Sequence, residues 1–224
     1  WRKDKIFLRD NTTINIKKNM RFREFEKQIR PLRAFNLNDI RKIDPAFHKP
    51  QLSDWVGRGY IRPLAGGFYI MADLKVDEPV LFMLANEVYK PSYISRESAL
   101  AAHGMIPETV LGVTSVSSRK TRRFDTHLGR FSYRSIRPDL MFGYRVVKRD
   151  EYTRYSIATL EKAVLDTLYW NPDIQSAAAF EQLRWNRDLA AELVKSQEFG
   201  KYLSIFNSKA LERRVVMLKE YIHA

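Results

Sequence analysis

The chain has 224 residues, 45% of them hydrophobic and 29% charged, which is the composition of a globular protein with one or two domains. It contains no cysteine, so a disulfide scaffold, a thiolate nucleophile and any cysteine-based zinc site are excluded. Lys and Arg number 39 against 26 Asp and Glu, and the resulting net charge of +13 favours a polyanionic partner such as nucleic acid.

The N-terminal part of the chain, residues 1–73, is predicted to hold an arm and a winged helix–turn–helix domain. Residues 1–18 are polar and basic, and we expect them to form the arm or a loosely docked strand. A first helix is predicted over residues 20–32, because aromatic and aliphatic side chains recur there at helical spacing. We expect this helix to pack under the next two and to complete a three-helix core.

Two short helices are predicted between residues 36 and 57, separated by a sharp turn. Asn36 is suited to cap the first of them, with Asp39 at its third position. That helix ends before Pro45, because the residue preceding a proline is pushed out of the helical region. Pro50 suits the first turn of the second helix, and Gly57 suits its end.

A hairpin is predicted next, from two β runs at residues 60–64 and 68–71 that are joined through Gly66 and Gly67. Only glycine adopts positive φ at both turn centres at little cost. Helix, turn, helix and hairpin in this order are typical of a protein that lays a helix in the DNA major groove with a wing beside it. The residues expected to contact DNA are Lys49, Gln51, Ser53 and Asp54 at base edges, and Arg58 and Arg62 at phosphates.

The positive charge is concentrated on this N-terminal part. Residues 1–75 hold 17 basic and 8 acidic residues, a net of +9. Residues 76–150 hold 12 and 8, a net of +4, and residues 151–224 hold 10 and 10. Neutralisation of DNA phosphates requires such an excess on the reading domain. The alternative is a solvated basic surface with no nucleic-acid role.

Residues 74–224 are predicted to form a second, mixed domain with an antiparallel sheet and C-terminal helices. A helix is expected over residues 78–88, and Ser95 is expected to cap another over residues 96–103. Alternating β-branched and aromatic residues then predict four strands, at residues 110–116, 123–124, 129–136 and 143–147. Helices are expected from Ile157 onward, at residues 157–169, 174–183, 188–196 and 207–222.

No catalytic, cofactor or metal site is evident in the sequence. The four histidines are far apart and show no paired metal spacing. Asp139 could begin the carboxylate–lysine pattern of restriction-type nucleases, but no Asp/Glu-x-Lys follows at a strand-like spacing. Lys162 and Asp166 lie four residues apart on a predicted helix, which favours a structural ion pair. We therefore expect a protein that is not an enzyme and that uses no cofactor.

Two segments of the chain resemble the AbiEi family, the antitoxins of type IV abortive-infection toxin–antitoxin pairs. They are residues 90–108, which contain Pro91-Ser92-Tyr93-Ile94-Ser95 and His103-Gly104, and residues 157–166. An upstream Leu52-x-x-Trp55 pattern and Gly59…Gly67-x-Tyr69 pattern fit as well. The chain departs from the family in its unusually basic first helix, in Ala65 where a charged residue is common, and in its last 50 or so residues.

The resemblance, over roughly residues 20–170, implies a bifunctional protein. The winged helix represses its own operon by binding operator repeats in double-stranded DNA. The C-terminal domain counters a nucleotidyltransferase-type toxin, without a stable complex being required. The toxin half depends on the resemblance alone. The expected antitoxin surface consists of the basic residues around the predicted strands, which are Arg119, Lys120, Arg122, Arg123, Arg130, Arg134 and Arg137. The alternative is that these residues only solubilise the sheet.

Two other functions stay open on the sequence. One is a winged-helix transcription regulator without a toxin partner, whose C-terminal domain serves dimerisation or ligand sensing. The other is a divergent nuclease with a winged-helix targeting domain. No apolar run approaches the ~18 residues that a membrane span requires, and no signal-peptide pattern is present. We therefore expect a cytoplasmic protein with no membrane partner.

Overall fold

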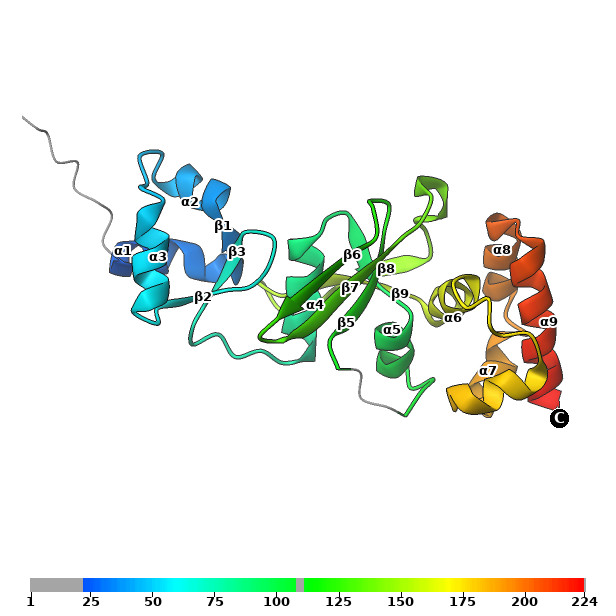
Figure 1. Cartoon of the computed structure of the whole chain (residues 1–224). Helices are drawn as coiled ribbons and strands as arrows, with labels where there is room; N and C mark the ends of the chain where they lie inside the picture. Colours follow the sequence, from blue (N-terminus) through cyan, green and yellow to red (C-terminus); the bar gives the residue numbers. More distant parts are fainter. Residues whose placement is uncertain (1–21, 108–110, 224) are drawn as a thin grey trace, which may run out of the picture.

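The protein is a mixed α+β molecule, as the sequence predicts (Figure 1). The structure, a computed structural model, describes residues 22–107 and 111–223. The predicted arm at residues 1–18 lies outside the described residues, as does the start of the first predicted helix. Figure 1 shows three parts in a row, namely an N-terminal group of short helices around a small sheet, a central six-stranded sheet, and a group of C-terminal helices.

The N-terminal segment, residues 22–74, folds around a three-stranded antiparallel sheet in the order β1-β3-β2. Its elements are α1 (Phe22–Ile29), the 3-10 helix η1 (Arg30–Leu32), β1 (Ala34–Asn36), α2 (Leu37–Ile43), α3 (Pro50–Gly57), β2 (Ile61–Pro63) and β3 (Phe68–Met71). The first predicted helix ends in the 3-10 turn because Pro31 has no N–H for an α-helical hydrogen bond. β1 is absent from the sequence prediction, since a three-residue strand is too short to show a period.

The predicted helix cap and the predicted hairpin of this segment are both confirmed. The Asn36 side chain accepts the Asp39 N–H at 3.4 Å, and the Asp39 carboxylate accepts the Asn36 N–H at 3.1 Å, which completes a capping box. Gly66 and Gly67 have φ values of +59° and +82° between β2 and β3, as the glycine turn requires. Short-range side-chain chemistry therefore sets where these elements begin and end.

A compact apolar cluster fixes the N-terminal helices. It consists of Phe25, Ile29, Phe35, Ile40, Phe47, Leu52, Trp55, Ile61 and Met71. The Trp55 ring lies 4.5 Å from the Phe25 ring and 5.3 Å from the Phe47 ring, measured between centroids. Aromatic side chains bury large areas and lock one another in place, so α3 is held rigidly by its inner face.

The central sheet has the strand order β6-β7-β5-β4-β9-β8. Its elements are α4 (Glu78–Val88), β4 (Ser92–Ile94), α5 (Glu97–Ala102), β5 (Val113–Ser117), β6 (Arg122–Thr126), β7 (Gly129–Ser135), the 3-10 helix η2 (Pro138–Leu140), β8 (Tyr144–Lys148) and β9 (Arg154–Ala158). The pairs β4–β9 and β5–β7 are parallel, so the expectation of an antiparallel sheet is wrong and the sheet is mixed. β4 and β9, two neighbouring inner strands of this sheet, are absent from the sequence prediction.

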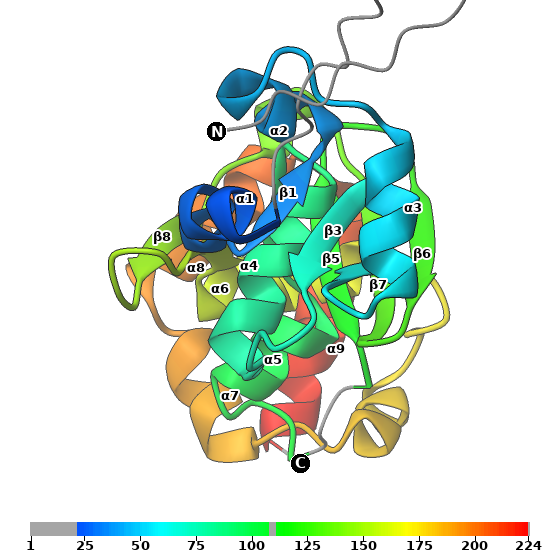
Figure 2. The same ribbon diagram turned by 90° about the vertical axis from the view of Figure 1, so that its left-hand side faces the viewer.

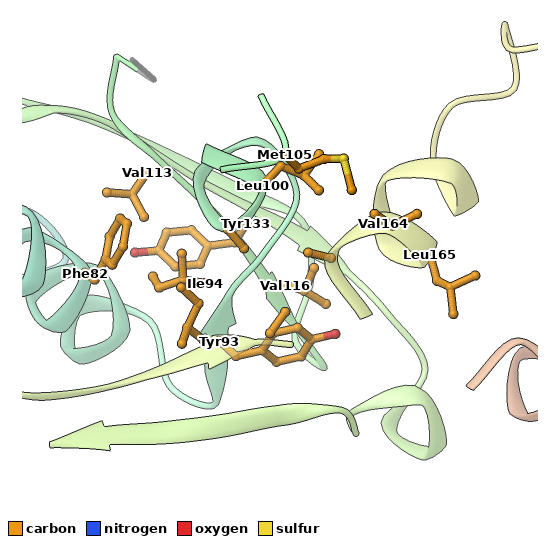
Figure 3. Packing of buried hydrophobic residues seen from close by; sticks show 14 of the residues in the cluster. Phe82, Tyr93, Ile94, Leu100, Met105, Val113, Val116, Tyr133, Val164 and Leu165 are labelled. Atoms are coloured by element: carbon orange, nitrogen blue, oxygen red, sulfur yellow. The ribbon is translucent and has the colours of Figure 1, made fainter. Parts of the chain in front are cut away.

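Helices cover both faces of the central sheet. On one face, the Tyr133 hydroxyl of β7 donates to the Ala85 carbonyl of α4 at 2.7 Å. On the other face, the Tyr93 hydroxyl of β4 donates to the Asp166 carboxylate at 2.9 Å, across to the helices that follow the sheet. Figure 3 shows the apolar side chains between these layers packed into one continuous cluster.

The C-terminal helices are α6 (Leu160–Tyr169), the 3-10 helix η3 (Ala177–Leu183), α7 (Arg187–Leu193), α8 (Gln197–Phe206) and α9 (Lys209–His223). The helix expected to begin at Ile157 begins later, because residues 154–158 form β9 and Thr159 caps α6. The α-helix expected at residues 174–183 is a 3-10 helix instead, and α8 was not expected. Among the described residues, no helix is long and apolar enough to cross a membrane.

Both faces of the small N-terminal sheet carry buried apolar residues. Its inner face belongs to the aromatic cluster around Trp55, whereas Ala34, Leu64 and Ile70 belong to the apolar cluster of the central part. A Cβ atom added at Gly66 in the β2–β3 turn would lie 3.6 Å from the Val88 carbonyl oxygen at the end of α4. The hairpin thus joins the N-terminal segment to α4.

Candidate nucleic-acid interface

The residues predicted to reach base edges lie at the start of α3 and differ in exposure, because the side-chain amide oxygen of Gln51 is buried. Lys49, Ser53 and Asp54 are exposed, and Gln51 is half-buried. Leu52 and Trp55 on the inner face keep 3% and 4% exposure and anchor the helix in the aromatic cluster. The structure therefore places three of the predicted residues on α3 and the fourth, Lys49, at its N-cap, on a rigid support.

The two arginines predicted to contact phosphates differ in their surroundings. The Arg58 guanidinium donates from Nε to the Asp54 carboxylate at 3.0 Å, and this hydrogen bond raises the pKa of Arg58. Arg62 is exposed on β2, an edge strand, opposite Ile70 of β3. Residues directly opposite on paired strands share a face of the sheet. Arg62 therefore lies on the face that turns toward the central part of the molecule.

The basic residues of the central sheet divide between its two faces and do not form one surface. By strand register, Arg122 shares the α4 face with Tyr133, whereas Arg123, Arg130 and Arg134 alternate onto the opposite face. Several of the predicted residues also have partners of their own. Arg123 and Arg130 lie 4.0 and 2.8 Å from Asp125, Arg137 lies 3.1 Å from Asp139, and Arg119 lies over the Tyr89 ring.

α3 and β6 lie on the same side of the molecule, and β8 lies on the other. Figure 2 shows α3 and β6 together on its right, with α1 and β8 on its left. The two edges of the central sheet therefore lie on opposite sides in this view, with β6 on the side of α3. This arrangement depends on how the N-terminal segment packs on α4, and no pattern along the sequence could have predicted it.

Two sequence motifs meet in the interior at a buried ion pair. The Lys162 ammonium bonds to the Asp166 carboxylate, and neither side chain is exposed. The second Asp166 oxygen accepts the hydroxyls of Tyr93 at 2.9 Å and Ser95 at 2.7 Å. Burial is the main cause that lowers the pKa of Lys162 and that raises the pKa of Tyr93. The predicted structural pair is confirmed, and no solvent reaches it.

Ser95 does not cap α5, so that prediction is wrong. Its hydroxyl is used by Asp166, and the N-cap position is Arg96, which has a φ of +56°. The Ser98 N–H in the first turn of α5 is satisfied from β5 instead, by the Thr114 hydroxyl at 3.0 Å. Residues two apart on a strand point to the same face, so Tyr93 and Ser95 share a face. This spacing was the only sign in the sequence that both hydroxyls could bond to one partner, Asp166.

The described residues hold no group of three His, Asp or Glu side chains placed to bind a metal ion. Asp139, the residue with which a nuclease pattern could begin, is exposed and paired with Arg137. Neither a comparison with protein-family models nor a search of curated proteins gives a match for this chain. The functional assignment therefore rests on the geometry of the interface and on the sequence motifs.

Proposed function

We propose that the protein is a DNA-binding transcriptional autorepressor whose N-terminal segment is a winged helix. The observation that carries this proposal is the exposed face of α3 beside a glycine hairpin, on a segment (residues 22–74) with nine basic and six acidic residues. Its elements follow the order helix, strand, helix, helix, strand, strand, and its sheet order is β1-β3-β2. α3 occupies the place of a recognition helix, and the β2–β3 hairpin that of a wing.

In this proposal α3 enters the major groove with its N-terminal half. Lys49, Gln51, Ser53 and Asp54 reach base edges there, where each base pair presents a distinct pattern of donors and acceptors. Arg58 and Arg62 contact phosphates, which fix the position of the protein on the duplex without reading sequence. Because Arg58 is paired with Asp54, DNA binding must either keep this pair or exchange it for a phosphate.

The DNA half of the proposal is tested with the full chain and the duplex upstream of its own gene. Electrophoretic mobility shifts are expected at low salt, and affinity should fall steeply as salt rises, because each phosphate contact releases counterions. The charge reversal Arg58→Glu/Arg62→Glu should abolish the shift. An unshifted duplex at low salt, with folded wild-type protein, would remove the proposal.

We further propose that the C-terminal part is the antitoxin of a type IV pair, which counters a nucleotidyltransferase-type toxin. The support is the family resemblance, whose two segments meet in the structure at the Lys162–Asp166 pair. The proposed working surface consists of the arginines on the face of the β6–β7 hairpin opposite α4, namely Arg123, Arg130 and Arg134. Cognate toxin is a functional partner here and not a stable ligand.

Co-expression with the neighbouring putative toxin gene tests this half. The full chain with Arg58→Glu/Arg62→Glu should still rescue growth, because repression and neutralisation are separate. The variant Arg123→Glu/Arg130→Glu/Arg134→Glu should lose rescue and keep DNA binding. If the wild-type chain binds its upstream DNA but does not restore growth of cells that express the neighbouring toxin, the protein is a winged-helix regulator without a toxin partner.

A further inference from the structure

The turn between β5 and β6 is basic and contacts the end of α4. The β2–β3 hairpin contacts the end of α4 as well. The β5–β6 turn has the sequence Ser117-Ser118-Arg119-Lys120-Thr121-Arg122-Arg123, with four basic residues and no acidic one. No element of the proposed winged helix includes it. Basic side chains interleaved with hydroxyls are the groups that contact DNA phosphates most often.

Contacts run from the hairpin to this turn through three consecutive residues at the end of α4. Gly66 of the hairpin approaches Val88. The hydroxyl of Tyr89, the next residue, donates to the Lys120 carbonyl at 2.8 Å. The Arg119 guanidinium donates to the Lys90 carbonyl at 3.1 Å and lies 4.2 Å from the Tyr89 ring centroid. The hairpin and the turn are thus held by the same short piece of chain.

Arg119 and Ser117 fix the turn, and Lys120 and Arg122 are left for a partner. The Ser117 hydroxyl donates to the Pro91 carbonyl at 2.7 Å and accepts the Arg119 N–H at 3.1 Å. Lys120 and Arg122 are exposed, and among the described residues neither forms an ion pair. The Arg122 guanidinium lies 5.3 Å from the Phe124 ring centroid, a contact that uses none of its N–H donors. A rigid turn with free cations loses little conformational entropy when it binds an anion.

The turn lies on the side of the molecule that α3 occupies. Figure 2 shows β6, which begins at the end of this turn, on the same side as α3. Arg62, the proposed phosphate contact in the hairpin, shares the sheet face that turns toward the central part. A duplex that seats α3 in its major groove and touches the hairpin with its backbone therefore meets the turn next.

We propose that the β5–β6 turn is a second wing, which contacts the phosphate backbone of the same DNA duplex through Lys120 and Arg122. The inference rests on the proposed DNA binding and extends it from the N-terminal segment to the central sheet. The contact adds affinity and lengthens the protected stretch of DNA, and it reads no sequence. The basic residues of the central sheet then serve two purposes, with Lys120 and Arg122 on DNA and the opposite face available to another partner.

The test measures DNA affinity of the full chain as a function of salt. Lys120→Gln/Arg122→Gln should lower the slope of log affinity against log salt by about 1.8, from two contacts at about 0.9 each. At 0.1 M salt the affinity should fall roughly 60-fold, since a slope of 0.9 over the decade from 1 M gives about eightfold per contact. The loss should be equal on the upstream duplex and on random DNA.

The matched control is Arg145→Gln/Lys148→Gln on β8, at the opposite edge of the same sheet. These two residues are also exposed and also form no ion pair among the described residues, so the same charge is removed away from α3. We expect a salt slope close to that of the wild type. Thermal unfolding of both variants at the wild-type temperature establishes that the fold is kept.

The outcomes separate this inference from the proposed function. Wild-type protein that binds no duplex would overturn both. Wild-type protein that binds, together with a Lys120→Gln/Arg122→Gln variant that keeps the wild-type salt slope, would overturn the second wing alone. Equal slope losses in the β8 control would also overturn it, because the effect would then reflect total charge. A variant that keeps its slope but loses growth rescue would assign the turn to the antitoxin surface instead.

Discussion

The N-terminal segment and the rest of the chain keep their polar side chains in different places. The aromatic cluster around Trp55 is made only of apolar residues, and the chemistry of that segment lies on its surface. Among the described residues, the buried polar side chains all come later in the chain, at Asn86, Ser95, Ser98, Ser115, Ser117, Thr153, Lys162, Asp166 and Thr167. The first part thus keeps most of its polar groups on its surface, and the second uses many of them to hold its own strands.

This difference is tested most strongly by breaking the interior ion pair. Asp166→Ala leaves the Lys162 ammonium buried without its partner, and removal of one member of a buried pair costs about 3–5 kcal/mol of unfolding free energy. Lys162→Met/Asp166→Leu removes both charges and should recover most of that loss. Urea unfolding measures both values. A loss under 1 kcal/mol in the single variant would show that the pair does not hold the interior.

The same variant should respond to pH in a defined direction. Burial lowers the pKa of Lys162 below its ordinary value of 10.5, and Asp166 acts in the opposite direction. Without that carboxylate the folded state loses its proton before the unfolded chain does, so unfolding free energy should rise with pH as pH approaches 10.5. Urea unfolding of Asp166→Ala at rising alkaline pH checks this, and a flat profile relative to the Lys162→Met/Asp166→Leu protein would contradict it.

Truncation of a side chain in the apolar cluster of the N-terminal segment should also lower the unfolding free energy, but without a dependence on pH. Trp55→Ala removes the side chain on which the Phe25 and Phe47 rings pack, and truncation of a buried tryptophan costs about 3–5 kcal/mol. No polar group is stranded, so this loss should be insensitive to pH. Near-ultraviolet circular dichroism and urea unfolding report it. A folded Trp55→Ala protein with altered sequence preference would instead place Trp55 in the DNA interface.

Substitutions at the predicted DNA contacts on α3 and β2 should change recognition more than stability. Gln51→Ala should weaken binding to the upstream duplex by roughly 1–3 kcal/mol and binding to random DNA very little, as loss of a base contact does. Arg62→Ala should weaken both equally, because a phosphate contact carries no sequence information. Fluorescence anisotropy measures the affinity of both variants for the upstream duplex and for the random duplex. Equal losses for Gln51→Ala would mean that α3 does not read bases.

The same difference explains how far the sequence could be interpreted. In the N-terminal segment, caps and turn glycines act within a few residues. Asn36 and Gly66 therefore indicate from the sequence where α2 begins and where β2 turns into β3. In the central part the decisive partners are far apart. Ser95 has the residue type and position of a helix cap, yet its hydroxyl bonds to Asp166, which lies 71 residues away. β9 is hidden because Ile157, which pairs with Ile94 of β4, also fits the apolar stripe of the next helix.

The candidate interface shows the same limit. The α3 residues could be named from the sequence, because helix, turn and hairpin are local patterns. The sequence could not predict which basic residues of the central sheet lie on which of its two faces, because this depends on strand register. Arg122 and Arg123 are neighbours in the chain, but pairing of β6 with β7 places them on opposite faces. Parallel pairing of β5 with β7, which no hairpin pattern predicts, sets the position of the β5–β6 turn that we propose as a second wing.

We propose that the α3 side of the molecule faces DNA, and site-specific photocrosslinking tests this most directly. A benzophenone side chain replaces Ser53 on α3 in one full-length protein and Val146 on β8, which is 65% exposed, in another. Irradiation with the labelled upstream duplex should crosslink the protein with the probe at position 53 and not the one with the probe at position 146. Crosslinks from position 146 alone would place DNA on the opposite side of the molecule and contradict the account.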